Sequence, residues 1–338
     1  MFSLIFNIPH VAMPPISKRE NTRHEALRTA WQGEFPSAII DPEVDREEWF
    51  EQANRWDAVR RSAVDFEPII GPMPSPDPAL RVIGVYTQNS FDHESIYEGY
   101  AWPDAVSARA ATNWWAEQAF QPYLGRRFIV GHVPGERIPT GHPASITAQM
   151  ANLARESDLD AMVKIIARSK YMSVERMVIP QNTSESGVQN LLWNTLGYAM
   201  EHLGDTPNGI QISDWIPMRK EYRIAMIDYA PVAGAGCIEK LDPCFSLDPN
   251  QAFDPQVESI RGDAILLVDQ KSVVRYRAAA KAIGQSLRAN RSPLRNFVLD
   301  LAQTPDGTVV VVECNTMLNF GQYAMSFEPI LDAILQHT

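Results

Sequence analysis

The segment NFVLDLAQTPDGTVVVVECN, residues 296–315, carries two apolar runs on either side of the sequence Thr304-Pro-Asp-Gly307. Proline at the second turn position and glycine at the fourth are what a type I turn favours. Two apolar runs that flank such a turn are typical of a β-hairpin. The segment therefore predicts paired strands at 296–302 and 308–315.

Three polar side chains interrupt this hairpin: Asp300, Glu313 and Asn315. Because side chains alternate along a strand, Glu313 and Asn315 project from the same face. Asp300 shares that face if the loop contains two or four residues, whereas a three-residue bulged loop puts it on the opposite face. Two carboxylates and an amide oxygen among valines imply a cation, and ligation by oxygen alone suits Mg²⁺ or Mn²⁺. Alternatively the carboxylates pair with Arg295 or another cation, or line a solvated face, and the hairpin alone does not decide.

Two lysines upstream are candidates for binding phosphate. Lys164 lies inside the apolar segment 162–167, which is expected to be a strand, and a buried ammonium needs an anion such as a nucleotide phosphate. The alternative is a lysine at the edge of a strand that reaches water. Lys170, in the following loop 168–173, could close over the phosphates, and its alternative is an ordinary surface loop.

A strand end and a second hairpin follow. Asp214, Trp215 and Ile216 end a predicted strand just before Pro217, and an exposed strand end of this kind could hold the edge of an adenine ring. In the next strand Glu221 and Arg223 share one face. Arg223 suits phosphate geometry and Glu221 could orient it, whereas the alternative is a salt bridge between strands.

The remaining patterns predict a mixture of helices and strands. In the second half we expect strands at 161–167, 175–179 and 210–216, helices at 185–203, 271–289 and 323–336, and a hairpin with strands at 221–228 and 232–239. In the first half we expect strands at 1–8, 80–86 and 127–131, helices at 45–63 and 104–120, and a proline-rich connector at 68–78.

The order of these parts resembles the ATP-grasp superfamily over roughly residues 160–338, and the sharpest points are Glu221-Tyr-Arg223 and Glu313-Cys-Asn315. The resemblance implies an α+β fold in which two subdomains clasp the nucleotide in an ATP-grasp domain at 151–338, preceded by an N-terminal α/β domain at 1–150. The loop 168–173 departs from many members because it contains no glycine. In this respect the chain resembles a clade, many of whose members are phage-encoded, in which charged side chains cover the phosphates.

The resemblance also implies roles for the candidate residues. It places Lys164 on the α- and β-phosphates, Asp214, Trp215 and Ile216 at the adenine, and Arg223 near the transferring phosphate, with Lys170 as a further catalytic cation. Asp300, Glu313 and Asn315 would bind Mg²⁺.

Family members are typically ADP-forming ligases that join a carboxylate to an amine through an acyl phosphate. Small molecules and peptides are both open as substrates. The alternatives are an ATP-grasp phosphotransferase and a non-catalytic ATP-binding regulatory module.

Composition excludes several other classes. A formal net charge of −11 and a pI near 5.2 argue against a nucleic-acid-binding surface. Three cysteines without CxxC spacing favour free thiols in a reducing compartment, and no apolar run is long enough to span a membrane. We therefore expect a cytoplasmic protein without a membrane partner, and a homodimer remains open.

Overall fold

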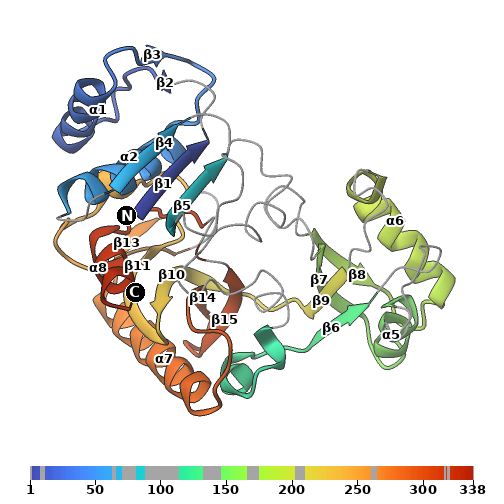
Figure 1. Cartoon of the computed structure of the whole chain (residues 1–338). Coiled ribbons are helices and arrows are strands. Elements are labelled where there is room, and N and C mark those ends of the chain that lie inside the picture. Colours follow the sequence, from blue (N-terminus) through green and yellow to red (C-terminus); the bar gives the residue numbers. More distant parts are fainter. Residues whose placement is uncertain are drawn as a thin grey trace. The chain divides into compact units, whose positions relative to one another are not determined.

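The computed structural model describes residues 2–7, 12–62, 66–70, 81–87, 114–131, 146–165, 175–201, 210–259, 265–315, 317 and 320–337 (Figure 1). The chain divides into two compact units. The first unit combines residues 1–123 with residues 218–338, and the second comprises residues 124–217. Among the helices of the described part, none has both the length and the apolar character needed to cross a membrane.

Four antiparallel strands form the main sheet of the first unit, in the order β11-β10-β14-β15. Their bounds are β10 Arg219–Ile227, β11 Ala230–Gly236, β14 Phe297–Gln303 and β15 Val309–Asn315. Both predicted hairpins are therefore confirmed.

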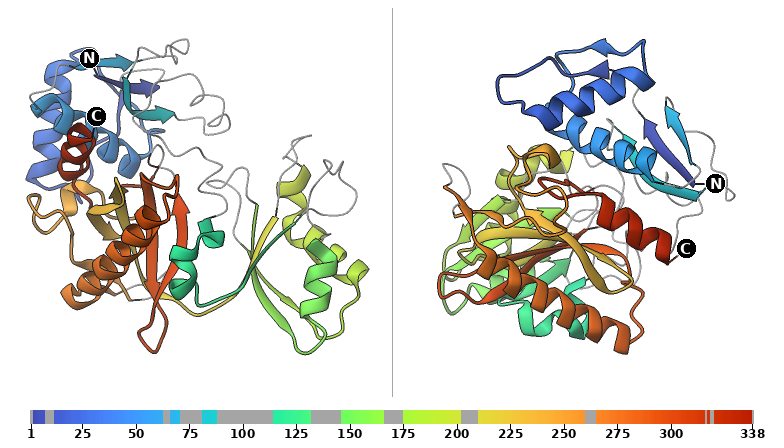
Figure 2. Two further views of the ribbon diagram at one scale, coloured as in Figure 1. Left: turned by 60° about the horizontal axis from the view of Figure 1, so that its bottom comes forward. Right: turned by 90° about the vertical axis from the view of Figure 1, so that its left-hand side faces the viewer.

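Helix α7, Gln270–Ala289, packs against one face of the main sheet, and its predicted position is confirmed (Figure 2). On that face the rings of Tyr222 and Tyr276 stack with their centroids 5.4 Å apart. Because side chains alternate along β10, the neighbouring Arg223 lies on the other face.

That other face of the main sheet packs against α2, Arg46–Arg61, and α8, Glu328–Gln336. One buried cluster joins side chains from all three elements: Ala225, Ala235, Val298, Trp49, Phe50, Trp56, Ile330 and Ile334. Burying each large apolar side chain contributes about 1.5–3 kcal/mol to folding. Arg223 and Asp300 therefore lie on the face of the sheet whose remaining residues form the core with α2 and α8.

The N-terminal part of the first unit contains a parallel sheet in the order β4-β1-β5. Its strands are β1 Phe2–Asn7, β4 Phe66–Ile70 and β5 Arg81–Thr87, which confirms the strands predicted at 1–8 and 80–86. The predicted proline-rich connector is wrong at its first residues, because Pro68 lies in β4. A proline is tolerated there because β4 lies at the edge of this sheet within the described part of the chain. Residues 71–80 lie outside the described residues.

Two further predictions need correction. The predicted helix at 104–120 is represented by two 3₁₀ helices, η2 Trp114–Ala116 and η3 Gln118–Tyr123, and its first ten positions lie outside the described residues. The predicted helix at 323–336 begins only at Glu328, because Tyr323 adopts a left-handed backbone with φ of 52°.

The smaller elements of the first unit were not predicted. They are β2 Ala12–Met13, α1 Thr22–Glu34, β3 Ile39–Ile40, η5 Pro243–Phe245, β12 Gln256–Glu258 and β13 Leu266–Val268. Helix α1 begins with a reciprocal capping box, in which the Asn21 side chain accepts from the backbone N–H of His24 and His24 accepts from that of Asn21.

The second unit has its own antiparallel sheet in the order β6-β9-β7-β8, with helices α5 Ile146–Leu153 and α6 Glu185–Glu201. Its strands are β6 Phe128–Gly131, β7 Leu159–Ile165, β8 Glu175–Ile179 and β9 Ile210–Asp214. The strands and the helix predicted here are confirmed, except that the strand predicted at 210–216 ends at Asp214. Positions 166–167 and 202–203 of the predicted elements lie outside the described residues. Ala161 and Val163 are buried with residues of both helices, so the helices cover that face of β7, and Lys164 lies on the opposite face.

Candidate active site

The loop of the C-terminal hairpin contains three residues. The backbone N–H of Thr304 donates to the carbonyl of Thr308 at 3.0 Å, which leaves Pro305–Gly307 between them. Gly307 has a φ of 85°, a left-handed conformation that glycine adopts without a steric penalty. A loop of this length, taken alone, would place Asp300 and Glu313 on opposite faces.

A β-bulge reverses that outcome. The register runs regularly from Gln303 opposite Val309 to Leu301 opposite Val311, and then it shifts so that Asp300 pairs with Glu313. Val312 is the extra residue in β15. Bulges of this kind re-aim the side chains that follow them. The three predicted metal ligands therefore share one face, as expected, but they do so through a bulge that compensates for the loop.

Asp300 forms a buried ion pair with Arg223. The two residues are directly opposite in the register of β10 and β14. Arg223 Nε donates to Asp300 Oδ1 at 2.7 Å and Nη2 donates to Oδ2 at 2.6 Å, while Asp300 is 0% exposed. Such a bidentate contact is the strongest geometry for an arginine–carboxylate pair. Asp300 therefore does pair with a cation of the protein, and that cation is Arg223.

Glu313 and Asn315 complete the group. Glu313 Oε1 lies 3.9 Å from Arg223 Nη2, and 29% of the Glu313 side chain is exposed. Asn315 Nδ2 donates to Glu313 Oε1 at 2.7 Å and contacts Asp300 Oδ2 at 3.3 Å. The amide N–H groups of Asn315 thus stand between two carboxylates. We refer to Arg223, Asp300, Glu313 and Asn315 below as the acidic cluster.

The acidic cluster fits a divalent cation. It contains two carboxylates and one guanidinium, so one negative charge is left over. Rotating the Asn315 amide by half a turn exchanges Nδ2 for Oδ1 and gives three oxygen donors on one face. Oxygen donors of this kind are what Mg²⁺ and Mn²⁺ prefer.

Electrostatics in the acidic cluster follow from its burial. Burial raises the pKa of the Asp300 carboxyl, the Arg223 charge opposes this effect, and the Glu313 charge adds to it. Burial also lowers the pKa of Arg223, but the contacts with Asp300 outweigh it and raise that pKa overall, so the guanidinium stays charged. A second cation beside Asp300 and Glu313 would therefore be electrostatically favourable.

Glu221 and Cys237 lie next to the acidic cluster. The backbone N–H of Cys237 donates to the carbonyl of Glu221 at 3.0 Å, and one ligand atom each of Glu221, Cys237 and Asp300 lies within 4.8 Å of the others. Glu221 therefore lies near Asp300, the partner of Arg223, and the role of Glu221 in orienting Arg223 stays a prediction. The proximity of Cys237 was missed, because a small side chain at the end of an apolar strand gives no signal of its own. Burial raises the pKa of the Cys237 thiol, so it is protonated at neutral pH.

The remaining candidates belong to the second unit. Lys164 is half-buried on the face of β7 that the helices leave uncovered, opposite Gln211 of β9. Asp214 binds the Arg127 guanidinium, with Arg127 Nη2 2.7 Å from Oδ1 and Nε 2.9 Å from Oδ2. Burial raises the pKa of Asp214, but its hydrogen bonds with Arg127 lower that pKa overall. Lys170 lies outside the described residues.

The predicted adenine-binding segment is partly engaged within its own sheet. The N–H of Asp214 donates to the carbonyl of Arg127 at 3.2 Å, and that of Trp215 donates to the carbonyl of Asp160 at 2.9 Å. Arg176 covers the Trp215 ring, with its guanidinium carbon 3.7 Å from the ring centroid. A contact between this segment and an adenine edge would therefore depend on Ile216 and on the backbone carbonyls.

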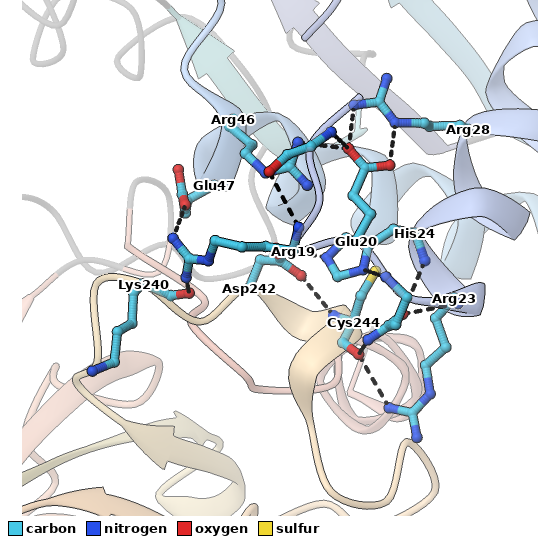
Figure 3. A network of polar contacts seen from close by, with 12 residues as sticks. Arg19, Glu20, Arg23, His24, Arg28, Arg46, Glu47, Lys240, Asp242 and Cys244 are labelled. Atoms are coloured by element: carbon cyan, nitrogen blue, oxygen red, sulfur yellow. Dashed lines mark hydrogen bonds and ion pairs between the residues drawn. The ribbon is translucent and has the colours of Figure 1, made fainter. Parts of the chain in front are cut away.

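A second group of potential ligands in the first unit does not suit a metal. Figure 3 shows His24, Asp242 and Cys244, all buried and close together. The backbone N–H of Asn21 donates to His24 Nδ1 at 3.0 Å, so the ring proton is on Nε2, which faces Asp242 Oδ2 at 3.0 Å. A metal ion bound to Nε2 would require the ring proton to be on Nδ1. Nδ1 could then no longer accept the hydrogen bond from the Asn21 N–H. The group instead fastens α1 to the segment 240–246.

No family model matches the sequence, and no curated protein sequence matches it. Solved structures that the chain matches include D-cycloserine synthetase DcsG, with 11% identity, a TM-score of 0.49 and coverage of 99% of this chain and 100% of that one. D-alanyl-alanine synthetase A from Vibrio cholerae has 8% identity and a TM-score of 0.48, with 99% and 98% covered. The ATP-grasp ligase PsnB has 13% identity and a TM-score of 0.42, with 99% of each chain covered.

All three TM-scores are below 0.5, so these likenesses carry no argument about the fold, activity or substrate of this chain. The proposals below rest on the chain's own residues.

Proposed function

We propose that this chain is an ATP-grasp ligase, which uses ATP and Mg²⁺ to join a carboxylate to an amine and releases ADP and phosphate. The observation that supports this most directly is the acidic cluster. Its oxygen atoms, its unbalanced negative charge and its adjoining arginine provide what a metal-bound triphosphate requires: ligands for the metal and a donor for phosphate oxygens.

Arg223 would act on the transferring phosphoryl group. A guanidinium has five N–H donors, and three of those of Arg223 bond to the described residues Asp300 and Gly321. Within the described part of the chain the other two N–H groups, one on Nη1 and one on Nη2, form no hydrogen bond, although Nη2 lies 3.9 Å from Glu313 Oε1. These two donors would bind phosphate oxygens. Because Asp300 holds the guanidinium from one side, these donors are oriented before the substrate binds, which is the condition for electrostatic stabilisation of a transition state.

The proposed reaction has two steps. An oxygen of the substrate carboxylate attacks the γ-phosphorus of ATP, the bond to the β-phosphate oxygen breaks, and ADP leaves. The amine nitrogen then attacks the acyl carbon, the bond to the phosphate oxygen breaks, and phosphate leaves while the amine gives up a proton to solvent. Mg²⁺ held by Asp300, Glu313 and Asn315 would neutralise phosphate charge. Arg223 would stabilise the charge that develops on the phosphoryl oxygens.

The second unit would supply further nucleotide contacts. Lys164 is assigned to the α- and β-phosphates, because it is a lysine on the face of β7 opposite the one that α5 and α6 cover. The segment 214–216 is assigned to the adenine, and Lys170 to the phosphates. The division into an N-terminal α/β domain at 1–150 and an ATP-grasp domain at 151–338 also remains a proposal, which limited proteolysis followed by mass spectrometry would test.

An amine-by-carboxylate screen tests the proposed function. Phosphate release is measured with ATP and Mg²⁺, the products are identified by mass spectrometry, and Glu313→Gln is the matched control. The proposal predicts an amide or peptide product, with ADP and phosphate formed only when both substrates are present, and loss of the signal in the variant.

Other outcomes would overturn the ligase assignment. A phosphorylated product without an amide would indicate a phosphotransferase. Binding of ATP without turnover across the screen would indicate a regulatory module. Absence of ATP binding would overturn the nucleotide assignment as a whole.

A further inference from the structure

We propose that helix α2 positions Arg223 for phosphoryl transfer, acting through the segment 320–325, and that Glu51, Arg55 and Tyr323 are positioning residues for this reaction. The backbone N–H of Met325 donates to the carbonyl of Gln322 at 3.1 Å, so this segment contains a turn, and residues 320–325 are called the turn below. The inference rests on the proposed function, because it assigns to these residues the orientation of the arginine that would contact the phosphoryl group. All of these residues belong to the first unit.

One face of α2 holds the turn through polar contacts. Arg55 Nη2 donates to the carbonyl of Phe320 at 2.7 Å, and its Nε donates to Gln322 Oε1 at 3.0 Å. Glu51 Oε1 accepts from the backbone N–H of Tyr323 at 2.7 Å. Glu51 and Arg55 are four residues apart and therefore lie on the same face of the helix. Both are buried, with exposures of 8% and 4%.

The buried side chain of Gln322 stabilises the turn through hydrogen bonds. It is 0% exposed, and its amide nitrogen donates to Asn54 Oδ1 at 2.8 Å and to the carbonyl of Met325 at 2.6 Å. Because Arg55 donates to the oxygen of the same amide, three contacts determine the orientation of this side chain. The turn cannot shift without breaking buried hydrogen bonds to α2.

The other side of the turn contacts Arg223. The Gly321 carbonyl accepts from Arg223 Nη1 at 3.1 Å, and the Arg223 guanidinium carbon lies 5.1 Å from the centroid of the Tyr323 ring. A Cβ added to Gly321 would lie 3.3 Å from Nη1, closer than an ordinary van der Waals contact. The guanidinium is thus held by Asp300 at one edge, by Gly321 at another and by an aromatic ring.

The backbone conformation of Tyr323 indicates that surrounding contacts hold this residue in an unfavourable geometry. Its φ of 52° lies in the left-handed region, which is unfavourable for a residue with a bulky side chain. Strain of this kind persists only where surrounding contacts enforce it, and it clusters at functional sites. Here Glu51 holds the N–H of Tyr323, and the ring lies beside the arginine. The strained residue therefore connects α2 to the acidic cluster.

A phosphoryl mimic tests the inference without knowledge of the substrates. The affinity for ADP and Mg²⁺ is measured by calorimetry with and without aluminium fluoride, which occupies the position of the transferring phosphoryl group. The proposal predicts that aluminium fluoride tightens ADP binding to the full-length protein. Gly321→Ala and Tyr323→Leu should reduce this gain at least tenfold, because they displace the guanidinium, while the affinity for ADP alone changes less than threefold.

Three controls separate positioning from folding. Tyr323→Phe keeps the ring and should keep the full tightening of ADP binding by aluminium fluoride. Arg55→Lys cannot reproduce the hydrogen bonds to both Phe320 and Gln322 and should lose part of this tightening. In an Arg223→Lys background, Gly321→Ala should have no further effect, because the residue through which it acts has been replaced. Thermal unfolding of each variant verifies that the protein is folded.

Two failures can be told apart. If aluminium fluoride gives no gain with the wild-type protein, or if Arg223→Lys keeps the whole gain, the proposed use of Arg223 is wrong. If Arg223→Lys loses the gain but Gly321→Ala and Tyr323→Leu keep it, the proposed function stands and the positioning role of the turn is overturned.

Discussion

Replacing Arg223 by methionine tests whether the acidic cluster contains a buried charge. Asp300 is 0% exposed, and both of its oxygens accept from Arg223, so Arg223→Met leaves a buried carboxylate without its cation, although the 3.3 Å contact to Asn315 Nδ2 remains. Removing one partner of a buried ion pair costs about 3–5 kcal/mol. We expect a loss of that size in the free energy of unfolding at pH 7.5, measured by urea denaturation and tryptophan fluorescence.

The pH dependence of this loss has a definite sign. Burial already raises the pKa of Asp300, and removing Arg223 also removes an influence that lowers it. Asp in the unfolded chain titrates near about 3.9. Between that value and the raised pKa, the folded variant binds more protons than the unfolded chain, so its stability falls as the pH rises. The loss in the free energy of unfolding relative to the wild-type protein should therefore be smallest near pH 4 and grow toward neutral pH.

A matched double variant isolates the charge. Arg223→Met combined with Asp300→Asn removes both members of the pair, leaves no buried carboxylate at this position, and should recover at least half of the lost stability at pH 7.5. If the single variant were as stable as the wild-type protein at pH 7.5, or if the double variant were less stable than the single one, the reasoning from a buried ion pair would be refuted.

Three further predictions concern other parts of the chain. Lys164→Ala should weaken ATP binding at least tenfold in calorimetry, and an unchanged affinity would remove Lys164 from the site. Deleting Val312 removes the bulge and leaves Glu313 directly opposite Asp300 in a regular register, so Mg²⁺-dependent ATP binding should be kept. A deletion variant that folds but loses this dependence would contradict the register argument. Burial raises the pKa of Asp269, the N-cap of α7, but hydrogen bonds from Lys220 and Ser272 lower it overall to about 2. Asp269→Asn keeps an N-cap acceptor but removes the charge that pairs with Lys220, so it should cost about 1 kcal/mol of stability at pH 7. A difference in stability from the wild-type protein that did not shrink as the pH falls from 4 to 2 would contradict a role for this charge.

The sequence was informative where local chemistry determines structure. Thr304-Pro-Asp-Gly307 marked the C-terminal turn, and the alternation of Glu313 and Asn315 placed both on one face, as the structure shows. The bulge at Val312 could not be predicted, because four consecutive valines give every register of β15 a similar hydrophobic pattern. The loop length alone would have separated the carboxylates.

Contacts between distant segments were the main omission. The pairing of Arg223 with Asp300 requires β10 to lie beside β14, and nothing in either strand reports the order of the sheet. Likewise, Glu51 and Arg55 occupy positions in a charged helix that suggest a solvated face. They are buried because the turn at 320–325 packs against them and supplies their hydrogen-bond partners.

Calorimetric titration of ATP into the wild-type protein and into Glu313→Gln, each with and without Mg²⁺, tests the central claim most directly. The side chain of Glu313 is 29% exposed, so a neutral residue of the same shape should leave the fold intact. The account predicts that Mg²⁺ tightens ATP binding to the wild-type protein at least tenfold and has little effect on the variant. A variant that keeps the full Mg²⁺ dependence would contradict the assignment of the acidic cluster as the metal site.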